Sequence, residues 1–69
     1  MIEFIVKVTK NNSETIVYNE VTSVSYSTQF MNNTWILILE ITCHIKGRLE
    51  YIDYDYDEIK SVEIYNEDK

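Results

Sequence analysis

Apolar and polar residues alternate along much of this chain with the two-residue period of a half-buried β-strand. Residues 2–9 show the pattern first, since every second residue is apolar: Ile2, Phe4, Val6 and Val8. Further strands are predicted at residues 14–18, 24–30, 35–46, 48–56 and 62–65. The run at 35–39 is apolar throughout, which is typical of a central strand covered on both faces. Residues 66–69 are predicted to be a frayed tail.

Short polar segments separate the predicted strands. Asn11-Asn12, Asn32-Asn33 and Gly47 lie at three of these breaks, and asparagine and glycine both tolerate the positive φ of hairpin turns. We therefore predict a mostly β protein, in which a six-strand antiparallel meander curls into a small sandwich or barrel.

One segment recurs within the chain. Residues 18–24 (YNEVTSV) resemble residues 56–62 (YDEIKSV), and each copy follows a predicted hairpin. The recurrence suggests a single domain, residues 1–69, built from two similar three-strand units at 1–30 and 35–65. Chance similarity is one alternative to this interpretation. Another is a short helix at 57–65 with Asp57 as its N-cap, although the β-rich first copy favours a strand.

The hairpin at Gly47 assigns faces to its two strands. A two-residue loop pairs odd positions before it with even positions after it. The predicted core face carries Trp35, Leu37, Leu39, Ile41, Cys43, Ile45, Ile52, Tyr54 and Tyr56. The opposite face carries Glu40, Thr42, His44, Leu49, Tyr51, Asp53, Asp55 and Asp57.

Composition supports the β assignment. Ile, Val and Thr make up 22 of the 69 residues, six more are Tyr, and there is neither Ala nor Pro. The longest apolar run has five residues, whereas a membrane-spanning helix needs about 20. The first residues lack the basic region of a signal peptide, and the single Cys cannot form an internal disulfide. We therefore expect a cytoplasmic protein without a membrane partner.

Charge is distributed unevenly. The net charge is −6, and residues 50–69 carry eight acids against two lysines, whereas acids and bases balance in residues 1–49. Nucleic acids and anionic membranes attract basic surfaces, so this chain is expected to bind neither of them directly. A basic, nucleic-acid-binding protein is the partner that this charge favours.

The sequence does not predict an enzyme. Cys43 and His44 are adjacent, so on a strand they point to opposite faces and cannot act as nucleophile and base. His44 does share its predicted face with Glu40 and Asp53, and one imidazole with two carboxylates is a donor set for zinc. A zinc ion held by these three residues is therefore one hypothesis. The alternative is a half-exposed histidine that lies near acids.

The most distinctive segment alternates acids with tyrosines at residues 53–58. On a strand, Asp53, Asp55 and Asp57 would lie roughly 6.6–6.8 Å apart, which resembles the spacing of phosphates along a nucleic-acid strand. Together with Glu58 and Tyr51, they are the candidate partner-binding residues. The alternative is a solubilising strand edge, where like charges prevent aggregation.

In size, charge and composition the chain resembles a class of small acidic phage proteins. The residues that carry the resemblance are the Asn-, Ile-, Tyr- and acid-rich stretches, such as 31–34 and 53–58. The class is that of the type II-A anti-CRISPR proteins, which bind Cas9 and often block its handling of DNA. These proteins share no common fold, so the resemblance carries over no site residues.

The resemblance implies an inhibitor of a nuclease of bacterial defence, with Cas9 favoured, that acts as a monomer or dimer in the cytoplasm of the bacterial host. The acidic surface would interfere with DNA binding by the nuclease. The alternative function is a structural or assembly β domain of a phage or mobile element, which would associate with itself through its strands.

Overall fold

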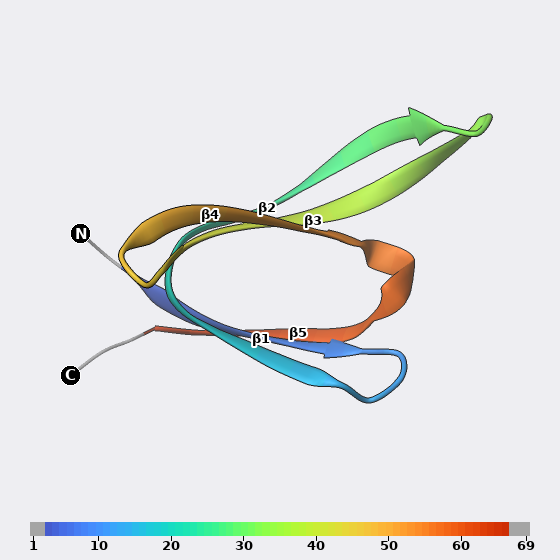
Figure 1. The fold of residues 1–69 in the computed structure, drawn as a ribbon. Coiled ribbons are helices and arrows are strands. Elements are labelled where there is room, and N and C mark those ends of the chain that lie inside the picture. Colours follow the sequence, from blue (N-terminus) through green and yellow to red (C-terminus); the bar gives the residue numbers. More distant parts are fainter. Residues whose placement is uncertain (1–2, 67–69) are drawn as a thin grey trace.

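The computed structural model describes residues 3–66, which form one antiparallel sheet with almost no helix (Figure 1). The elements are β1 (Phe4–Lys10), β2 (Thr15–Met31), β3 (Thr34–Ile45), β4 (Arg48–Asp55), the 3-10 turn η1 (Tyr56–Glu58) and β5 (Ile59–Asn66). The prediction of a mostly β fold is confirmed. The predicted strand start at Ile2 and residues 67–69 of the predicted tail lie outside the described residues.

The strands neighbour one another in the order β4, β3, β2, β1, β5. The first four strands form a meander, whereas β5 returns to pair with β1. η1 connects the two edge strands, and the sheet curls around an interior (Figure 1). The sheet is open, because β4 and β5 each have one hydrogen-bonded neighbour among the strands of residues 3–66.

The structure has five strands where the sequence predicts six, because β2 continues through the predicted connector at residues 19–23. The first part of β2 pairs with β1 and the second part with β3. Glu20 has a φ of 55°, and the register with β3 shifts between Val21 and Ser23. Such a bulge bends and twists a strand without ending it. The polar residues of the predicted connector therefore mark a bend.

The two copies of the recurring segment adopt different structures. Residues 18–24 lie within β2, whereas residues 56–58 form η1 and the following residues begin β5. The carboxylate of Asp55 accepts a hydrogen bond of 3.0 Å from the backbone N–H of Asp57, so Asp55 caps the turn in place of Asp57. The helical alternative is thus limited to one 3-10 turn, and the chain continues as a strand.

Pairs of residues with positive φ close the two longer hairpins. These residues are Asn32 (52°) and Asn33 (61°) between β2 and β3, and Lys46 (54°) and Gly47 (80°) between β3 and β4. Two consecutive residues with positive φ form a type I′ turn, whose twist matches that of the flanking strands. The predicted turns at Asn32-Asn33 and at Gly47 are therefore confirmed.

The short loop at Gly47 sets the register of β3 and β4 as predicted. Glu40 lies opposite Asp53, and Ile41 lies opposite Ile52. The predicted faces hold along the whole of β4, which ends at Asp55.

Six side chains form the fully buried core, and they come from β1, β2 and β3: Val6, Val8, Val21, Leu39, Ile41 and Cys43. The partly buried residues packed against them are Phe4, Tyr18, Val24, Ile52, Tyr54, Ile59 and Val62. The predicted core position of Cys43 is confirmed. Among residues 3–66, no helix has the length and apolar character needed to cross a bilayer.

Two ionisable groups at this core, Cys43 and Tyr18, have raised pKa values. Burial raises the pKa of the Cys43 thiol, and Glu50, which lies opposite on β4, raises it further. The Tyr18 and Tyr54 hydroxyls are hydrogen-bonded to each other, and the two rings lie edge to face with centroids 6.5 Å apart. Burial, followed by the hydrogen bond to Tyr54, raises the pKa of Tyr18.

Candidate functional site

β2 and β3 project beyond the rest of the sheet as a two-stranded ribbon (Figure 1). β4 pairs with β3 only from Ile38 onward, so residues 34–37 of β3 are paired with residues 28–31 of β2 alone among the described strands. The molecule consequently measures 45 Å along its longest axis but 24 and 19 Å across it. The ribbon is the most prominent feature of its outline.

One face of this ribbon is aromatic. Phe30 lies opposite Trp35, and their rings pack edge to face with centroids 5.2 Å apart. Nearer the sheet, Tyr26 packs edge to face against Tyr56 of η1, with centroids 5.8 Å apart. We call this surface the aromatic ribbon face, and its members are Tyr26, Phe30, Trp35, Leu37 and Tyr56. It continues the core face of the sheet out beyond the core, because Tyr26 lies opposite the buried Leu39.

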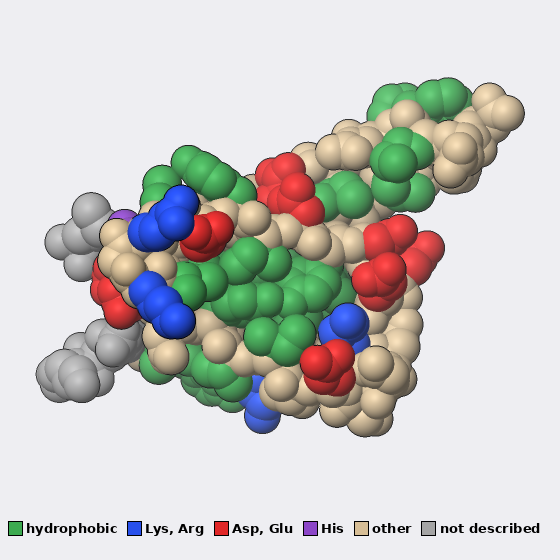
Figure 2. Space-filling view, viewed as in Figure 1, with side chains coloured by type: hydrophobic (Ala, Val, Ile, Leu, Met, Phe, Trp, Pro, Cys, Tyr) green, Lys and Arg blue, Asp and Glu red, His purple; other side chains and the backbone are tan. Residues whose placement is uncertain are grey.

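The aromatic ribbon face is open to solvent. Trp35 is 68% exposed and Phe30 is 57% exposed, and Figure 2 shows hydrophobic side chains along the projecting ribbon. The prediction that Trp35 packs in the core is wrong. β3 extends beyond its partner β4, so the first residues of β3 have no layer above them.

The acids predicted to form one row lie in different places. Asp53 is on the outer face of β4 opposite Glu40, and Asp55 caps η1. Asp57 and Glu58 are exposed in η1 itself, next to Tyr56. The predicted alternation therefore stops at Asp55, because the chain leaves the strand there. The evenly spaced row of three strand carboxylates is not formed.

The first hairpin holds η1 in place. The side-chain amide of Asn11 donates a hydrogen bond of 2.6 Å to the carbonyl oxygen of Asp57. The backbone N–H of Asn11 donates a hydrogen bond of 3.0 Å to the carbonyl oxygen of Glu58. These bonds use only the backbone of η1. The side chains of Asp57 and Glu58 remain exposed beside the aromatic ribbon face.

The acids of β4 and η1 have no ion-pair partner among residues 3–66. The ion pairs among residues 3–66 join Lys7 to Glu63 at 4.0 Å and Lys10 to Glu14 at 3.7 Å. The second pair lies on the β1–β2 hairpin against η1, where Lys10 lines one hollow with Asp57 and Glu58. Figure 2 shows acidic side chains where the ribbon meets the rest of the molecule. β4 and η1 together hold five acids and one base, Arg48, so this region is negatively charged overall.

The remaining predicted contact residue, Tyr51, is 73% exposed on the outer face of β4. Asp53 follows it on the same strand. The five candidate partner-binding residues are thus divided, since Tyr51 and Asp53 lie on the outer face of β4, Asp55 caps η1, and Asp57 and Glu58 lie beside the ribbon.

The three predicted metal ligands do not come together. His44 lies opposite Leu49, whereas Glu40 lies opposite Asp53. Four strand positions separate Glu40 from His44, which corresponds to about 13 Å. The carboxylate of Glu40 instead accepts hydrogen bonds from the hydroxyls of two serines of β2, Ser25 at 3.3 Å and Ser27 at 3.2 Å.

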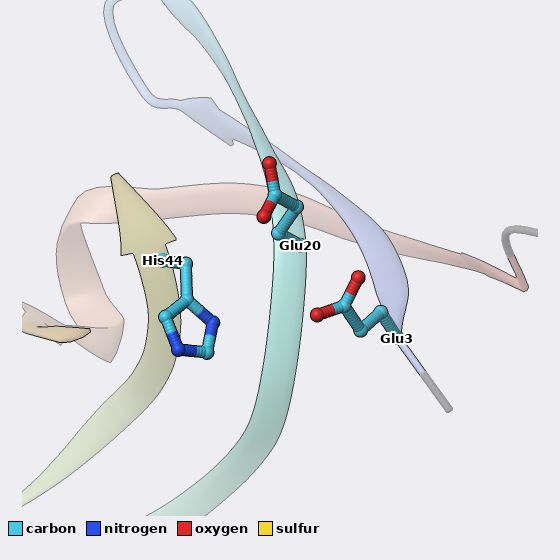
Figure 3. Close-up of side chains that lie close together, drawn as sticks. All are labelled: Glu3, Glu20 and His44. Atoms are coloured by element: carbon cyan, nitrogen blue, oxygen red, sulfur yellow. The ribbon is translucent and has the colours of Figure 1, made fainter. Parts of the chain in front are cut away.

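His44 has two other carboxylates as neighbours, those of Glu3 and Glu20 (Figure 3). Sequence reasoning missed this group, because its members are far apart in the chain. Only the pairing of β1, β2 and β3 brings them together. Cys43 is fully buried while His44 lies on the opposite face of β3, so the two do not form a nucleophile and base.

Comparisons of the chain with models of protein families, with curated proteins and with solved structures found no match. Two surfaces stand out among residues 3–66. One is the aromatic ribbon face with the acids of η1 beside it, and the other is the group around His44.

Proposed function

We propose that this protein is a non-catalytic binding protein that docks on another protein through the aromatic ribbon face. The observation that carries the proposal is the 68% exposure of Trp35, packed against Phe30 on a projecting ribbon. Aromatic residues are enriched among the contacts that dominate binding free energy. They also lose little conformational entropy when they are buried by a partner.

The negative charge of η1, beside the aromatic ribbon face, favours a basic partner. Asp57 and Glu58 are exposed and lack ion pairs within residues 3–66, and the chain has a net charge of −6. An apolar centre with an acidic rim fits a partner that presents an apolar pocket within a basic surface. Surfaces that bind nucleic acids are basic in this way.

The target class comes from the resemblance to the type II-A anti-CRISPR proteins. The proposed activity is inhibition of a nuclease of bacterial defence, with Cas9 favoured, inside the bacterial host cell. Occupation of the basic surface would hinder DNA binding by the nuclease. The exposed Tyr51 and Asp53 on the outer face of β4 would make a second contact with such a partner.

A cleavage assay tests this proposal. Guide-loaded Cas9 is incubated with the protein before target DNA is added, and inhibition is expected at near-stoichiometric amounts. A Trp35→Ala/Phe30→Ala variant should lose most of the inhibition, because it removes the apolar centre of the proposed contact. Val17→Thr is the matched control, since Val17 is also an exposed apolar residue of β2 but lies outside the ribbon.

Each negative outcome has a distinct meaning. No inhibition by the wild-type protein in large excess would exclude Cas9 as the target. Equal inhibition by the wild type and the ribbon variant would exclude the aromatic ribbon face as the contact surface.

The second candidate function is a structural or assembly domain that associates through its strands. The supporting observation is that β4 and β5 each have one sheet neighbour among the described strands. Unpaired strand edges can pair with the edges of another copy. Light scattering separates the two candidates, because a large oligomer that grows with concentration favours assembly, whereas a monomer or dimer favours the inhibitor.

Closure of the sheet into the predicted barrel would remove these free edges. Closure requires β4 and β5 to pair with each other, and η1 already joins them. Amide hydrogen exchange distinguishes the two arrangements. Outward-facing amides of β4 would be protected in a closed barrel and would exchange quickly from an open sheet.

A further inference from the structure

The outer face of the sheet carries one group of potential metal ligands drawn from three strands. Phe4 lies opposite Val21, and Val21 lies opposite Cys43, so these residues form a row across β1, β2 and β3. Val21 and Cys43 are fully buried in the core. Glu3, Glu20 and His44 are the residues next to this row, and none of them is buried (Figure 3).

The ligand atoms of these three side chains all lie within 4.8 Å of one another. Glu3 and His44 are half-buried, and Glu20 is exposed at the bend of β2, where its φ is 55°. A bulge at such a bend changes the direction of the side chains that it carries. The ion pairs found among residues 3–66 do not involve Glu3 or Glu20.

We propose that Glu3, Glu20 and His44 bind one Zn²⁺ ion through two carboxylate oxygens and one imidazole nitrogen. This is a different site from the one that the sequence predicts around His44. Zinc binds these donors at about 2.0–2.2 Å in a tetrahedral arrangement, so its ligand atoms are about 3.4 Å apart. Rotation of the glutamate side chains closes a gap of this size without movement of the strands.

Charge and access fit such an ion. Two carboxylates balance the two charges of Zn²⁺, and water would complete the tetrahedron. Glu20 and His44 line an open hollow of about 350 Å³, which provides a route for the ion. Lys46 lines the same hollow, but its ammonium group forms no ion pair with Glu3 or Glu20 among residues 3–66.

The bound ion would link the start of β1, the bend of β2 and the end of β3. Those segments are already joined by sheet hydrogen bonds and by the packing of Phe4, Val21 and Cys43, but a small core leaves such a protein marginally stable. The site is also separate from the proposed docking surface. His44 and Trp35 lie nine positions apart on β3, or about 30 Å.

Titration calorimetry with ZnCl₂ on tag-free, metal-stripped protein tests the proposal. The wild type should bind one Zn²⁺ per chain, and Glu20→Gln and His44→Gln should each weaken binding at least tenfold. Glu40→Gln/Asp53→Asn is the matched control. It removes two negative charges from the other predicted ligand set, and it should leave zinc affinity unchanged.

Two further readouts exclude a purely structural effect of the substitutions. At a free zinc concentration 100 times Kd, the melting temperature of the wild type should rise by at least about 10 °C, whereas that of His44→Gln should not change. Without zinc, all variants should melt as the wild type does. The proposal would be overturned if the wild type bound no zinc. It would also be overturned if Glu20→Gln and His44→Gln bound zinc as tightly as the wild type. Loss of binding in the Glu40→Gln/Asp53→Asn control would also overturn it, because general charge attraction would then account for the affinity.

Discussion

At the scale of single residues, two large apolar side chains of β3 have opposite environments. Leu39 is fully buried, whereas Trp35, four positions earlier on the same face, is 68% exposed. Burial of apolar area is the dominant favourable term in folding. Leu39 therefore contributes to the stability of the fold, whereas the exposed Trp35 is the centre of the proposed docking surface.

Truncation of these two residues should have different effects on stability. Leu39→Ala is expected to lower the free energy of unfolding by about 2–5 kcal/mol, because it leaves a cavity in the core. Trp35→Ala should cost at most about 1.5 kcal/mol, the usual contribution of an aromatic pair such as the one with Phe30. Urea denaturation of both variants measures the difference, and a larger loss for Trp35→Ala would contradict the structure.

The buried ionisable groups predict how stability depends on pH. Burial raises the pKa of Cys43 above its ordinary 9.0, and burial with the bond to Tyr54 raises that of Tyr18 above 10.0. Both groups are neutral below these values, so their contribution to the free energy of unfolding is fully present at pH 7. It is lost as pH rises above about 9, because unfolding then releases protons.

Thermal denaturation at pH 7, 9 and 10.5 should show this loss. Cys43→Val replaces the thiol with an apolar group of similar size, so its melting temperature should fall less than that of the wild type over the same range. Parallel curves for the two proteins would mean that Cys43 is not buried in the folded state.

At the scale of elements, the turns and bends determine the architecture. The two-residue loop at Lys46-Gly47 sets the register of β3 and β4. The bulge at Glu20 lies between the part of β2 that pairs with β1 and the part that pairs with β3. The aromatic ribbon face exists because β3 is longer than β4. The proposed docking surface thus depends on strand length as much as on strand sequence.

The β3–β4 turn allows a test of backbone conformation alone. Gly47 has a φ of 80°, and a Cβ atom added to it would meet no atom within 4 Å. Gly47→Ala should therefore lower stability by about 1–2 kcal/mol through backbone strain without any clash. Lys46→Asn is the companion variant, because Asn-Gly is the preferred type I′ pair. Chemical denaturation should show it to be at least as stable as the wild type.

At the scale of the whole molecule, shape and charge are the two properties that support the proposed docking. The radius of gyration is 12.9 Å, against about 11 Å for a compact domain of this length, and the ribbon accounts for the excess. The charge of −6 lies mainly in the last 20 residues. The molecule therefore presents an exposed apolar surface on the projecting ribbon, next to a sheet that carries the negative charge.

Salt should therefore affect the proposed complex differently from substitution of the ribbon. Raising ionic strength from 0.1 to 1 M shortens the Debye length from about 10 to 3 Å, so association with a basic partner should slow markedly. Trp35→Ala should instead accelerate dissociation, because it removes a central contact. Surface plasmon resonance separates the two rates, and an association rate that does not respond to salt would contradict electrostatic steering.

The sequence alone determined the strand class, the turns closed by Asn32-Asn33 and Gly47, and the facing residues of β3 and β4. These are local properties, since alternation sets the face of a strand and a two-residue loop sets its register. The position of Cys43 in the core follows from the same reasoning.

Only the tertiary structure decided that β2 continues through its polar bend, that β5 pairs with β1, and that Trp35 is uncovered. It also separated Asp53 from Asp57, and it brought Glu3, Glu20 and His44 together. Each outcome depends on contacts between segments far apart in the chain, which no local pattern encodes. The physical reason is that the place of a strand in a sheet is set by the apolar surface that all strands bury jointly.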